Sequence, residues 1–285
     1  MPAAMRVFIS ADMEGATGVC HRDHLLAGGQ DYEVARRWLT GDVNAAVEGA
    51  VAAGATDVVV ADGHATMRNL VLDDLHEAAR LVQGPAQARN RPFGQLAGHD
   101  AGGYDAAFMI GHHSRAGTPG GLLAHTWVGM LVKEIRLQGE PASESKLNAA
   151  LLGHYGVPVV LATGADDYCA QVRDELGDDL TVVAVKETIG PSAVLTLTPA
   201  RAQAAIRAAA AAAMQQPREP LRTGSPVRIE VEFWRDEMRE RAAELAGEPV
   251  GRTTLRYDGD DAPAVFRPVW AGLAHALRDE ASFLR

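Results

Sequence analysis

Carboxylate and imidazole side chains follow three short apolar segments of the chain. Residues 7–9 run into Ser10-Ala11-Asp12-Met13-Glu14-Gly15, residues 57–61 into Asp62-Gly63-His64, and residues 106–110 into Gly111-His112-His113. The carboxyl ends of parallel strands meet at one edge of an open α/β sheet, and ligands bind in the crevice outside that edge. If the three segments are such strands, the sequence predicts that these polar side chains lie together.

Asp12 and Glu14 are two residues apart, so in extended backbone their side chains point to the same side. Two carboxylates held together repel each other unless a cation or a proton lies between them. The pair could also be an ordinary polar loop or the start of a helix. Gly15 permits a tight backbone turn directly after the pair, which favours a binding site.

The histidines leave more than one interpretation open. A lone histidine is more often solvated than bound to a ligand, but His64 is predicted at the same sheet edge as the two carboxylates. Adjacent side chains in a strand diverge, so one of His112 and His113 is expected to face the site, and we take His113. Asp62 could orient one of these imidazoles by a hydrogen bond without itself binding the ligand.

Two further residues lie later in the chain. His125 follows a glycine-rich stretch over residues 117–121, which suits a mobile acid or base, although it could also be a surface histidine. Glu144 stands in the first turn of a predicted helix, where the helix dipole alone would favour a carboxylate.

Oxygen and nitrogen ligands without sulfur suit Zn²⁺, with Mn²⁺ or Co²⁺ possible, better than Mg²⁺. The set comprises Asp12, Glu14, His64 and His113, and Glu144 would be a fifth ligand. Five ligands exceed the need of one tetrahedral ion, so two metals sharing a carboxylate are the economical arrangement. Because two metals can activate a water and polarise a carbonyl, the residues predict a metal-dependent hydrolase.

Apolar strands alternate with helical segments through the first part of the chain, which predicts a mainly parallel sheet sandwiched by helices. We expect helices over residues 32–53 and 143–155 and a fourth strand over 157–162. Later elements indicate a smaller C-terminal α+β unit: helices over 200–214, 234–246 and 262–284, and strands over 227–233 and 253–257. The predicted division is an α/β domain over residues 5–180 and an α+β domain over residues 181–285.

The composition excludes several classes of protein. The 285 residues carry a formal net charge of −10, which argues against nucleic acid as a partner. The two cysteines, Cys20 and Cys169, are too few for a disulfide framework. The sequence shows neither a secretory signal nor an apolar run of membrane-spanning length. A cytoplasmic protein that does not interact with membranes is therefore expected.

These motifs together resemble the DppA-type zinc D-aminopeptidases, a family of binuclear metallopeptidases. The resemblance rests on five motifs in order: Ser10-Ala11-Asp12-Met13-Glu14-Gly15, Asp62-Gly63-His64, Gly111-His112-His113-Ser114, Ala124-His125-Thr126-Trp127 and Ser143-Glu144 followed by Leu147-Asn148-Ala149. It spans residues 6–199 in order. His112 stands where the family usually has tyrosine, and Ser143 stands where it has glycine.

The resemblance implies that Asp12 bridges two zinc ions per subunit, with Glu14, His64, His113 and Glu144 completing their coordination. It matches His125 to the family's catalytic histidine. We expect His125 to act as an acid/base or to stabilise the oxyanion, while a metal-activated water is the nucleophile. It further implies hydrolysis of short peptides with D-configured small N-terminal residues such as D-Ala, and assembly into a homo-oligomer, a decamer.

Two other classes of function remain as alternatives. A related metal-dependent amidohydrolase would act on a non-peptide or cell-wall-derived amide. A phosphoesterase is disfavoured, because Arg115 is the only basic residue near the motifs. A non-enzymatic protein with a structural metal is disfavoured too, since structural zinc sites are closed and usually rich in cysteine.

Overall fold

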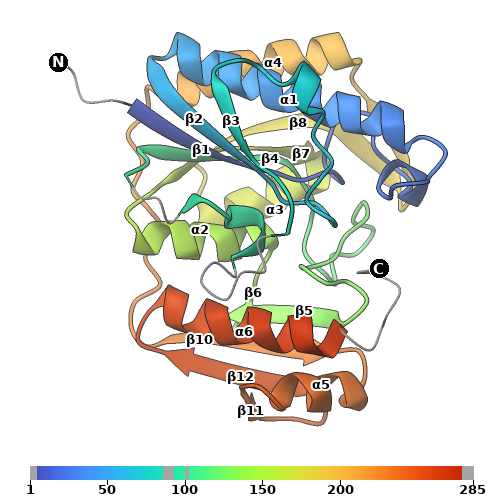
Figure 1. Cartoon of the computed structure of the whole chain (residues 1–285), viewed down its shortest axis with the longest axis vertical. Coiled ribbons are helices and arrows are strands. Elements are labelled where there is room, and N and C mark those ends of the chain that lie inside the picture. Colours follow the sequence, from blue (N-terminus) through green and yellow to red (C-terminus); the bar gives the residue numbers. More distant parts are fainter. Residues whose placement is uncertain (1–4, 86–92, 100–102, 278–285) are drawn as a thin grey trace.

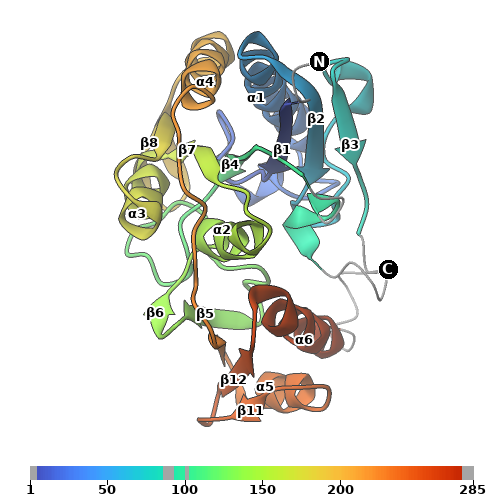
Figure 2. The same cartoon turned by 90° about the vertical axis from the view of Figure 1, so that its left-hand side faces the viewer.

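The computed structural model describes residues 5–85, 93–99 and 103–277 as two sheets with helices around and between them (Figures 1 and 2). The larger sheet has the strand order β3-β2-β1-β4-β7-β8-β9, and all its pairings are parallel except β8 with β9. Its strands are β1 (Met5–Ala11), β2 (Ala55–Asp62), β3 (Ala79–Val82), β4 (Ala106–His112), β7 (Val159–Ala165), β8 (Thr181–Gly190) and β9 (Ala193–Thr196).

Helices cover both faces of this sheet, which explains why its central strands are apolar without alternation. In Figure 1, α1 (Tyr32–Ala52) and α4 (Pro199–Ala213) lie above the sheet, and α2 (Glu144–His154) and α3 (Asp166–Leu176) lie below it. The α1 helix ends before Gly54, whose φ of +105° suits glycine. The predicted sandwich of a mainly parallel sheet between helices is confirmed.

The smaller sheet is antiparallel and has the order β11-β12-β10-β5-β6. Its strands are β5 (Val132–Leu137), β6 (Glu140–Pro141), β10 (Val227–Phe233), β11 (Glu248–Pro249) and β12 (Thr254–Gly259). As the alternating sequence predicts, β10 buries every second residue. The α6 helix (Ala262–Leu277) lies between this sheet and α2, beside α5 (Asp236–Ala243) (Figure 2). Residues 278–284 of the predicted last helix lie outside the described residues.

The two sheets do not divide the chain at residue 180. β8, β9 and α4 all follow that position and still belong to the larger layered unit. Conversely, β5 and β6 come from the first half of the chain and pair into the smaller sheet with β10. The chain therefore crosses to the smaller sheet after β4, returns through α2, and crosses again after α4. The domain boundaries remain a prediction.

Backbone hydrogen bonds join the carboxyl ends of the three central strands. Gly63 N–H donates to the carbonyl of Ala11, and Gly15 N–H donates to that of Gly111, both at 2.8 Å. A Cβ on Gly15 would overlap the carbonyl oxygen of His112, and Gly111 has a φ of +74°. Glycine is therefore required where the ends of β1 and β4 nest together. None of the described helices is long and apolar enough to cross a lipid bilayer.

Close packing of α1 on α4 yields a stability prediction. A Cβ on Gly49 would overlap the carbonyl oxygen of Arg207 and lie 2.6 Å from the Cβ of Ala210. Replacing Gly49 with leucine should force the helices apart and lower the free energy of unfolding by about 1–3 kcal/mol. Denaturant unfolding would measure the loss. Ala52→Leu, at an exposed position of the same helix, is the control, and equal stability of the two variants would contradict this packing.

Candidate metal centre

The predicted ligands come from four different elements and are all buried. Asp12 and Glu14 follow β1, His64 follows β2, His113 follows β4, and Glu144 is the first residue of α2. Each of these five residues is at most 6% exposed to solvent. His125, in the loop between β4 and β5, is partly exposed.

The carboxylate of Asp12 lies at the middle of the group. Its Oδ1 is 3.3 Å from His64 Nδ1, and its Oδ2 is 3.4 Å from His113 Nε2. Around it, Glu14 Oε2 lies 3.0 Å from His64 Nδ1, and Glu144 Oε1 lies 3.5 Å from His113 Nε2. The structure thus brings together all five residues that the sequence selects.

His112 differs from the expectation that only one of the two adjacent histidines faces the site. Its Nδ1 lies 3.8 Å from Asp12 Oδ2, and its Nε2 lies 3.3 Å from Ser10 Oγ. The expectation assumed regular extended backbone, but Gly111 has a φ of +74° and the pairing of β4 with β7 shifts register before His112. Both imidazoles therefore approach Asp12.

Asp62 holds the loop that carries His64 and does not contact the imidazole. Its carboxylate accepts hydrogen bonds from the backbone N–H groups of Asn69 and Leu70 and from Asn69 Nδ2. Asn69 Nδ2 also donates to the carbonyl oxygen of His64 at 2.7 Å. Asp62 therefore supports His64 through the backbone of its loop, and not by orienting the imidazole directly as the sequence suggested.

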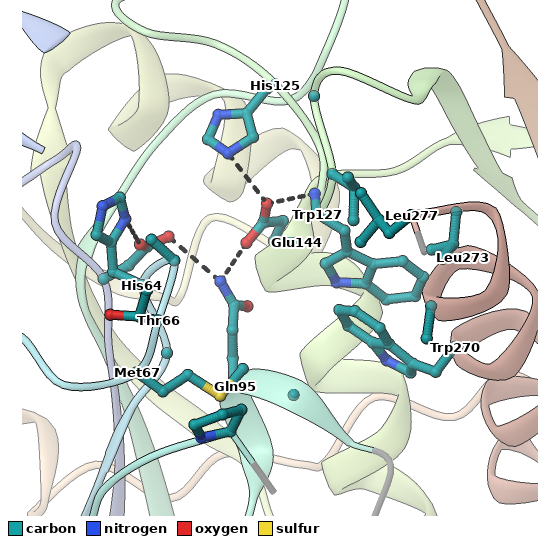
Figure 3. A pocket seen from close by; sticks show the side chains of 18 of the residues that line it. His64, Thr66, Met67, Gln95, His125, Trp127, Glu144, Trp270, Leu273 and Leu277 are labelled. Atoms are coloured by element: carbon teal, nitrogen blue, oxygen red, sulfur yellow. Dashed lines mark hydrogen bonds and ion pairs between the residues drawn. The ribbon is translucent and has the colours of Figure 1, made fainter. Parts of the chain in front are cut away.

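Gln95 is a site residue that the sequence analysis missed. Its Nε2 donates to Asp12 Oδ2 at 3.3 Å and to Glu144 Oε2, and its Oε1 accepts from Asn148 Nδ2 at 2.7 Å. Figure 3 shows this amide beside the carboxylate of Glu144, with its hydrogen bonds as dashed lines. Gln95 fixes the orientation of both, but a glutamine outside any recognisable motif gives no signal in a sequence.

Lys186 is a second missed residue. It is 2% exposed, and its Nζ donates to the carbonyl oxygens of Glu14, Ala16 and Val19 at 2.7, 2.7 and 2.5 Å. Burial lowers the pKa of this ammonium to about 7. Lys186 therefore shapes the loop that begins with Glu14. The available signal was a lone basic residue directly after the apolar run Val182-Val183-Ala184-Val185.

Glu144 is both a first-turn carboxylate favoured by the helix dipole and a member of the buried group around Asp12. Ser143 caps α2 by accepting a hydrogen bond from Lys146 N–H, which places Glu144 in the first turn. Glu144 Oε1 accepts a hydrogen bond from the backbone N–H of Trp127 at 2.5 Å. The helix start therefore delivers this carboxylate into the site.

Strained backbone flanks the two histidines on loops. Ala65 and Met67 beside His64, and Leu123 and Trp127 beside His125, have φ values of +44°, +55°, +51° and +54°. Such values are costly for residues other than glycine and concentrate at functional sites. The surrounding contacts must therefore hold these two loops in place.

His125 presents a defined nitrogen to the centre. Its ring stacks on that of His113 with centroids 4.0 Å apart, and its Nδ1 lies 3.0 Å from the carbonyl oxygen of Leu123. That carbonyl can only accept, so Nδ1 carries a proton and the other nitrogen is free to exchange one. His125 Nε2 lies 3.9 Å from Glu144 Oε1 and 4.0 Å from Glu14 Oε1.

The carboxylates control the protonation of the buried imidazoles. Burial disfavours protonated His64, but the charge of Glu14 and a hydrogen bond to Asp12 outweigh burial and hold the pKa of His64 well above 6.5. The same competition, with Glu144 and Asp12 as partners, raises the pKa of His113. For Asp12, burial raises the pKa, and the neighbouring imidazoles of His113 and His64 more than reverse that effect.

The donor set fits divalent cations. The buried atoms His112 Nδ1 and His113 Nε2 have no hydrogen-bond partner among the described residues, and both lie within 4 Å of Asp12. Ligand atoms of Asp12, Glu14 and His64 lie within 4.8 Å of one another, as do those of Asp12, His112 and Glu144 and those of Glu14, His113 and His125. His113 Nε2 also lies within 3.5 Å of both Asp12 and Glu144. Two such groups sharing one carboxylate could hold two ions, the arrangement of metal-dependent hydrolases.

The fold and this cluster thus define the class of metal-dependent hydrolases, and comparison with known proteins identifies the family. The family model of D-aminopeptidases matches residues 5–271. The chain is 33% identical to a D-aminopeptidase of Bacillus subtilis (strain 168) over 261 residues, 90% of this chain and 92% of the relative. This chain therefore belongs to the D-aminopeptidase family and is an enzyme, as predicted.

A solved structure supports the same relationship. The Zn-dependent D-aminopeptidase DppA from Bacillus subtilis, described as a self-compartmentalizing protease, superposes with a TM-score of 0.89 and 29% identity. The match covers 96% of this chain and 98% of that one. The resemblance inferred from the motifs is confirmed.

The raised pKa values of His64 and His113 predict that metal and protons compete. Because nearby carboxylates raise the pKa of both imidazoles, we expect a metal that binds them to compete with protons at neutral pH. Zinc binding at pH 7 should release about two protons per subunit, and the apparent affinity should rise with pH. Calorimetry in buffers of different ionisation enthalpy would measure the release. A binding enthalpy that is the same in every buffer would contradict the prediction.

Lys186 yields a prediction on stability. Lys186→Met leaves the carbonyl oxygens of Glu14, Ala16 and Val19 without their shared donor. The free energy of unfolding should fall by about 2–4 kcal/mol, because unsatisfied buried groups are costly. Lys133→Met is the control, since Lys133 pairs with Glu232 at the surface, and it should cost less than about 1 kcal/mol. Similar melting curves for both variants would show that the hydrogen bonds of Lys186 to this loop do not stabilise the fold.

Proposed function

We propose that this chain is a zinc-dependent aminopeptidase that removes small D-configured residues, such as D-Ala, from the N-termini of short peptides. The observation that carries the proposal is the buried group of carboxylates and imidazoles centred on Asp12. Family membership supports the reaction, and the zinc dependence of the structural relative DppA supports the metal. We extend to this chain the relative's self-compartmentalizing character, as assembly into a homo-oligomer.

In this proposal, two zinc ions are held by residues of this chain. Asp12, Glu14 and His64 would bind one ion, and Asp12, His113 and Glu144 the other, with Asp12 shared. Bound zinc supplies Lewis acidity toward the scissile carbonyl and makes water nucleophilic near neutral pH. Gln95 would keep the carboxylates of Asp12 and Glu144 aligned through its amide.

His125 would move protons in the reaction. The Leu123 carbonyl fixes the proton on Nδ1, so Nε2 faces the centre as a base. In this role Nε2 accepts a proton as water attacks the carbonyl and returns it to the leaving amine. The stacked ring of His113 and the glycine-rich loop before Leu123 position the imidazole at the open side of the site.

A chiral dipeptide assay tests the proposal. Zinc-loaded protein should hydrolyse D-Ala-D-Ala faster than L-Ala-L-Ala, and metal analysis should find two zinc ions per chain. Asp12→Asn should lose zinc and activity together. His125→Ala should keep its zinc while kcat falls by about 10²–10⁴, the usual contribution of a general acid or base.

His154→Ala, an exposed histidine on α2, is the matched control and should change neither zinc content nor kcat. Full activity after exhaustive chelation, or in the Asp12→Asn variant, would overturn the proposal. Preference for a non-peptide amide over D-Ala-D-Ala would favour the related amidohydrolase.

A further inference from the structure

The candidate centre lies at one end of a cavity of about 1140 Å³. Asp12, Glu14, His64, His125 and Glu144 all line it. This volume exceeds the roughly 300–1,000 Å³ of ordinary ligand pockets. An aminopeptidase needs space for only one residue before the scissile bond, so most of this cavity is available to the part of the substrate that follows it.

One side of the cavity is an apolar surface, here called the α6 wall and formed by Trp127, Trp270, Leu273 and Leu277. Figure 3 shows these four side chains together beside Glu144. The last three belong to α6 and repeat at positions i, i+3 and i+7, which lie on one face of a helix. The rings of Trp127 and Trp270 pack with centroids 4.7 Å apart. The wall therefore combines two packed indole rings with the aliphatic side chains of Leu273 and Leu277.

The wall is linked directly to the centre. Trp127 contributes its indole to the wall, and its backbone N–H donates to Glu144 Oε1 at 2.5 Å. The indole of Trp270 lies so close to Gly94 that a Cβ there would be 2.8 Å from it, and the next residue is Gln95. A group lying on the wall thus touches the same segments that hold the carboxylates.

Positive charge accompanies the wall. Arg22, Arg68 and Arg267 line the cavity and are exposed, and none has a carboxylate partner in the described part of the chain. Arg267 lies over the ring of Phe93, 5.7 Å from its centroid, and its exposed guanidinium can still form charge-assisted hydrogen bonds with an anion that enters the cavity. Arg115, the basic residue near the sequence motifs, differs from these three because it pairs with Glu175 at 3.6 Å.

We propose that the α6 wall binds a large apolar or aromatic side chain on the residue after the scissile bond, and that Arg267 receives the C-terminal carboxylate of that residue. Arg267 and Trp270 are three residues apart on α6, so they are neighbours on its surface. The carboxylate and the apolar side chain therefore belong to the same substrate residue. This assignment rests on the proposed aminopeptidase activity and names its substrate class, short peptides ending in an apolar residue.

The test compares zinc-loaded protein on D-Ala-D-Phe, D-Ala-Gly and D-Phe-D-Ala. The kcat/KM for D-Ala-D-Phe should exceed that for D-Ala-Gly about tenfold, mainly through KM, because an aromatic side chain is removed from water. Trp270→Ala should bring the ratio of kcat/KM for D-Ala-D-Phe to that for D-Ala-Gly close to one, while Trp270→Phe should retain the ratio. Arg267→Gln should abolish the preference for D-Ala-D-Phe over its C-terminal amide.

Leu277→Ala in the wall and Leu72→Ala, an exposed leucine outside the cavity, form a matched pair, of which only the first should affect D-Ala-D-Phe. Equal kcat/KM for D-Ala-D-Phe and D-Ala-Gly would overturn the assignment and leave the peptidase function intact. A Trp270-dependent preference for D-Phe-D-Ala would place the N-terminal residue on the wall instead and also overturn it.

Light scattering tests whether a second copy of the chain, and not substrate, occupies the α6 wall. A Trp270→Ala protein with an altered oligomeric state and unchanged KM values would mean that a second copy of the chain covers the wall, which again overturns the assignment. If zinc-loaded protein hydrolyses no D-dipeptide at all, the proposed function itself fails, and the assignment falls with it. The two failures are therefore distinguishable.

Discussion

The structure depends on one electrostatic constraint: three carboxylates and three imidazoles share a buried space around Asp12. Carboxylates without compensation would repel one another and lose their hydration. The carboxylates raise the pKa of His64 and His113, which favours protons on these imidazoles, and the same nitrogen atoms suit divalent cations. Protonation and metal binding are thus alternative solutions to one problem, and the surrounding fold must keep the group assembled for either.

Much of the larger unit serves to maintain that assembly. The glycine turns at Gly15 and Gly111 let the ends of β1 and β4 meet, and Lys186 reaches from β8 to three carbonyl groups of the loop after Asp12. Asp42 binds Thr17 in the same loop, and burial raises the pKa of its carboxyl to about 6. Gln95 then orients two of the carboxylates directly. These contacts come from widely separated parts of the chain, so the centre is a product of the whole sheet edge.

The smaller sheet contributes to the site without supplying any of the predicted ligands. It supports α6, which faces the centre across the cavity and contributes Trp270 to the apolar wall. The chain enters this sheet between His113 and Glu144, so the loop with His125 lies between the two units. Chemistry is therefore concentrated at the parallel sheet, while the shape of the cavity depends on how the second unit packs against it.

The sequence by itself determined the central strands, the main helices and the residues at the strand ends, because apolar runs, caps and ligand-type residues are local features. It did not reveal that β5 and β6 join β10 and β12, since pairing of strands far apart in the chain depends on tertiary packing. The sequence also gave no indication that Gln95 and Lys186 belong to the site, and its pattern predicted that the side chains of His112 and His113 diverge. Those outcomes depend on backbone turns and long-range hydrogen bonds. Only the folded chain decides which polar atoms lose water together, and that loss of water gives each of these residues its role.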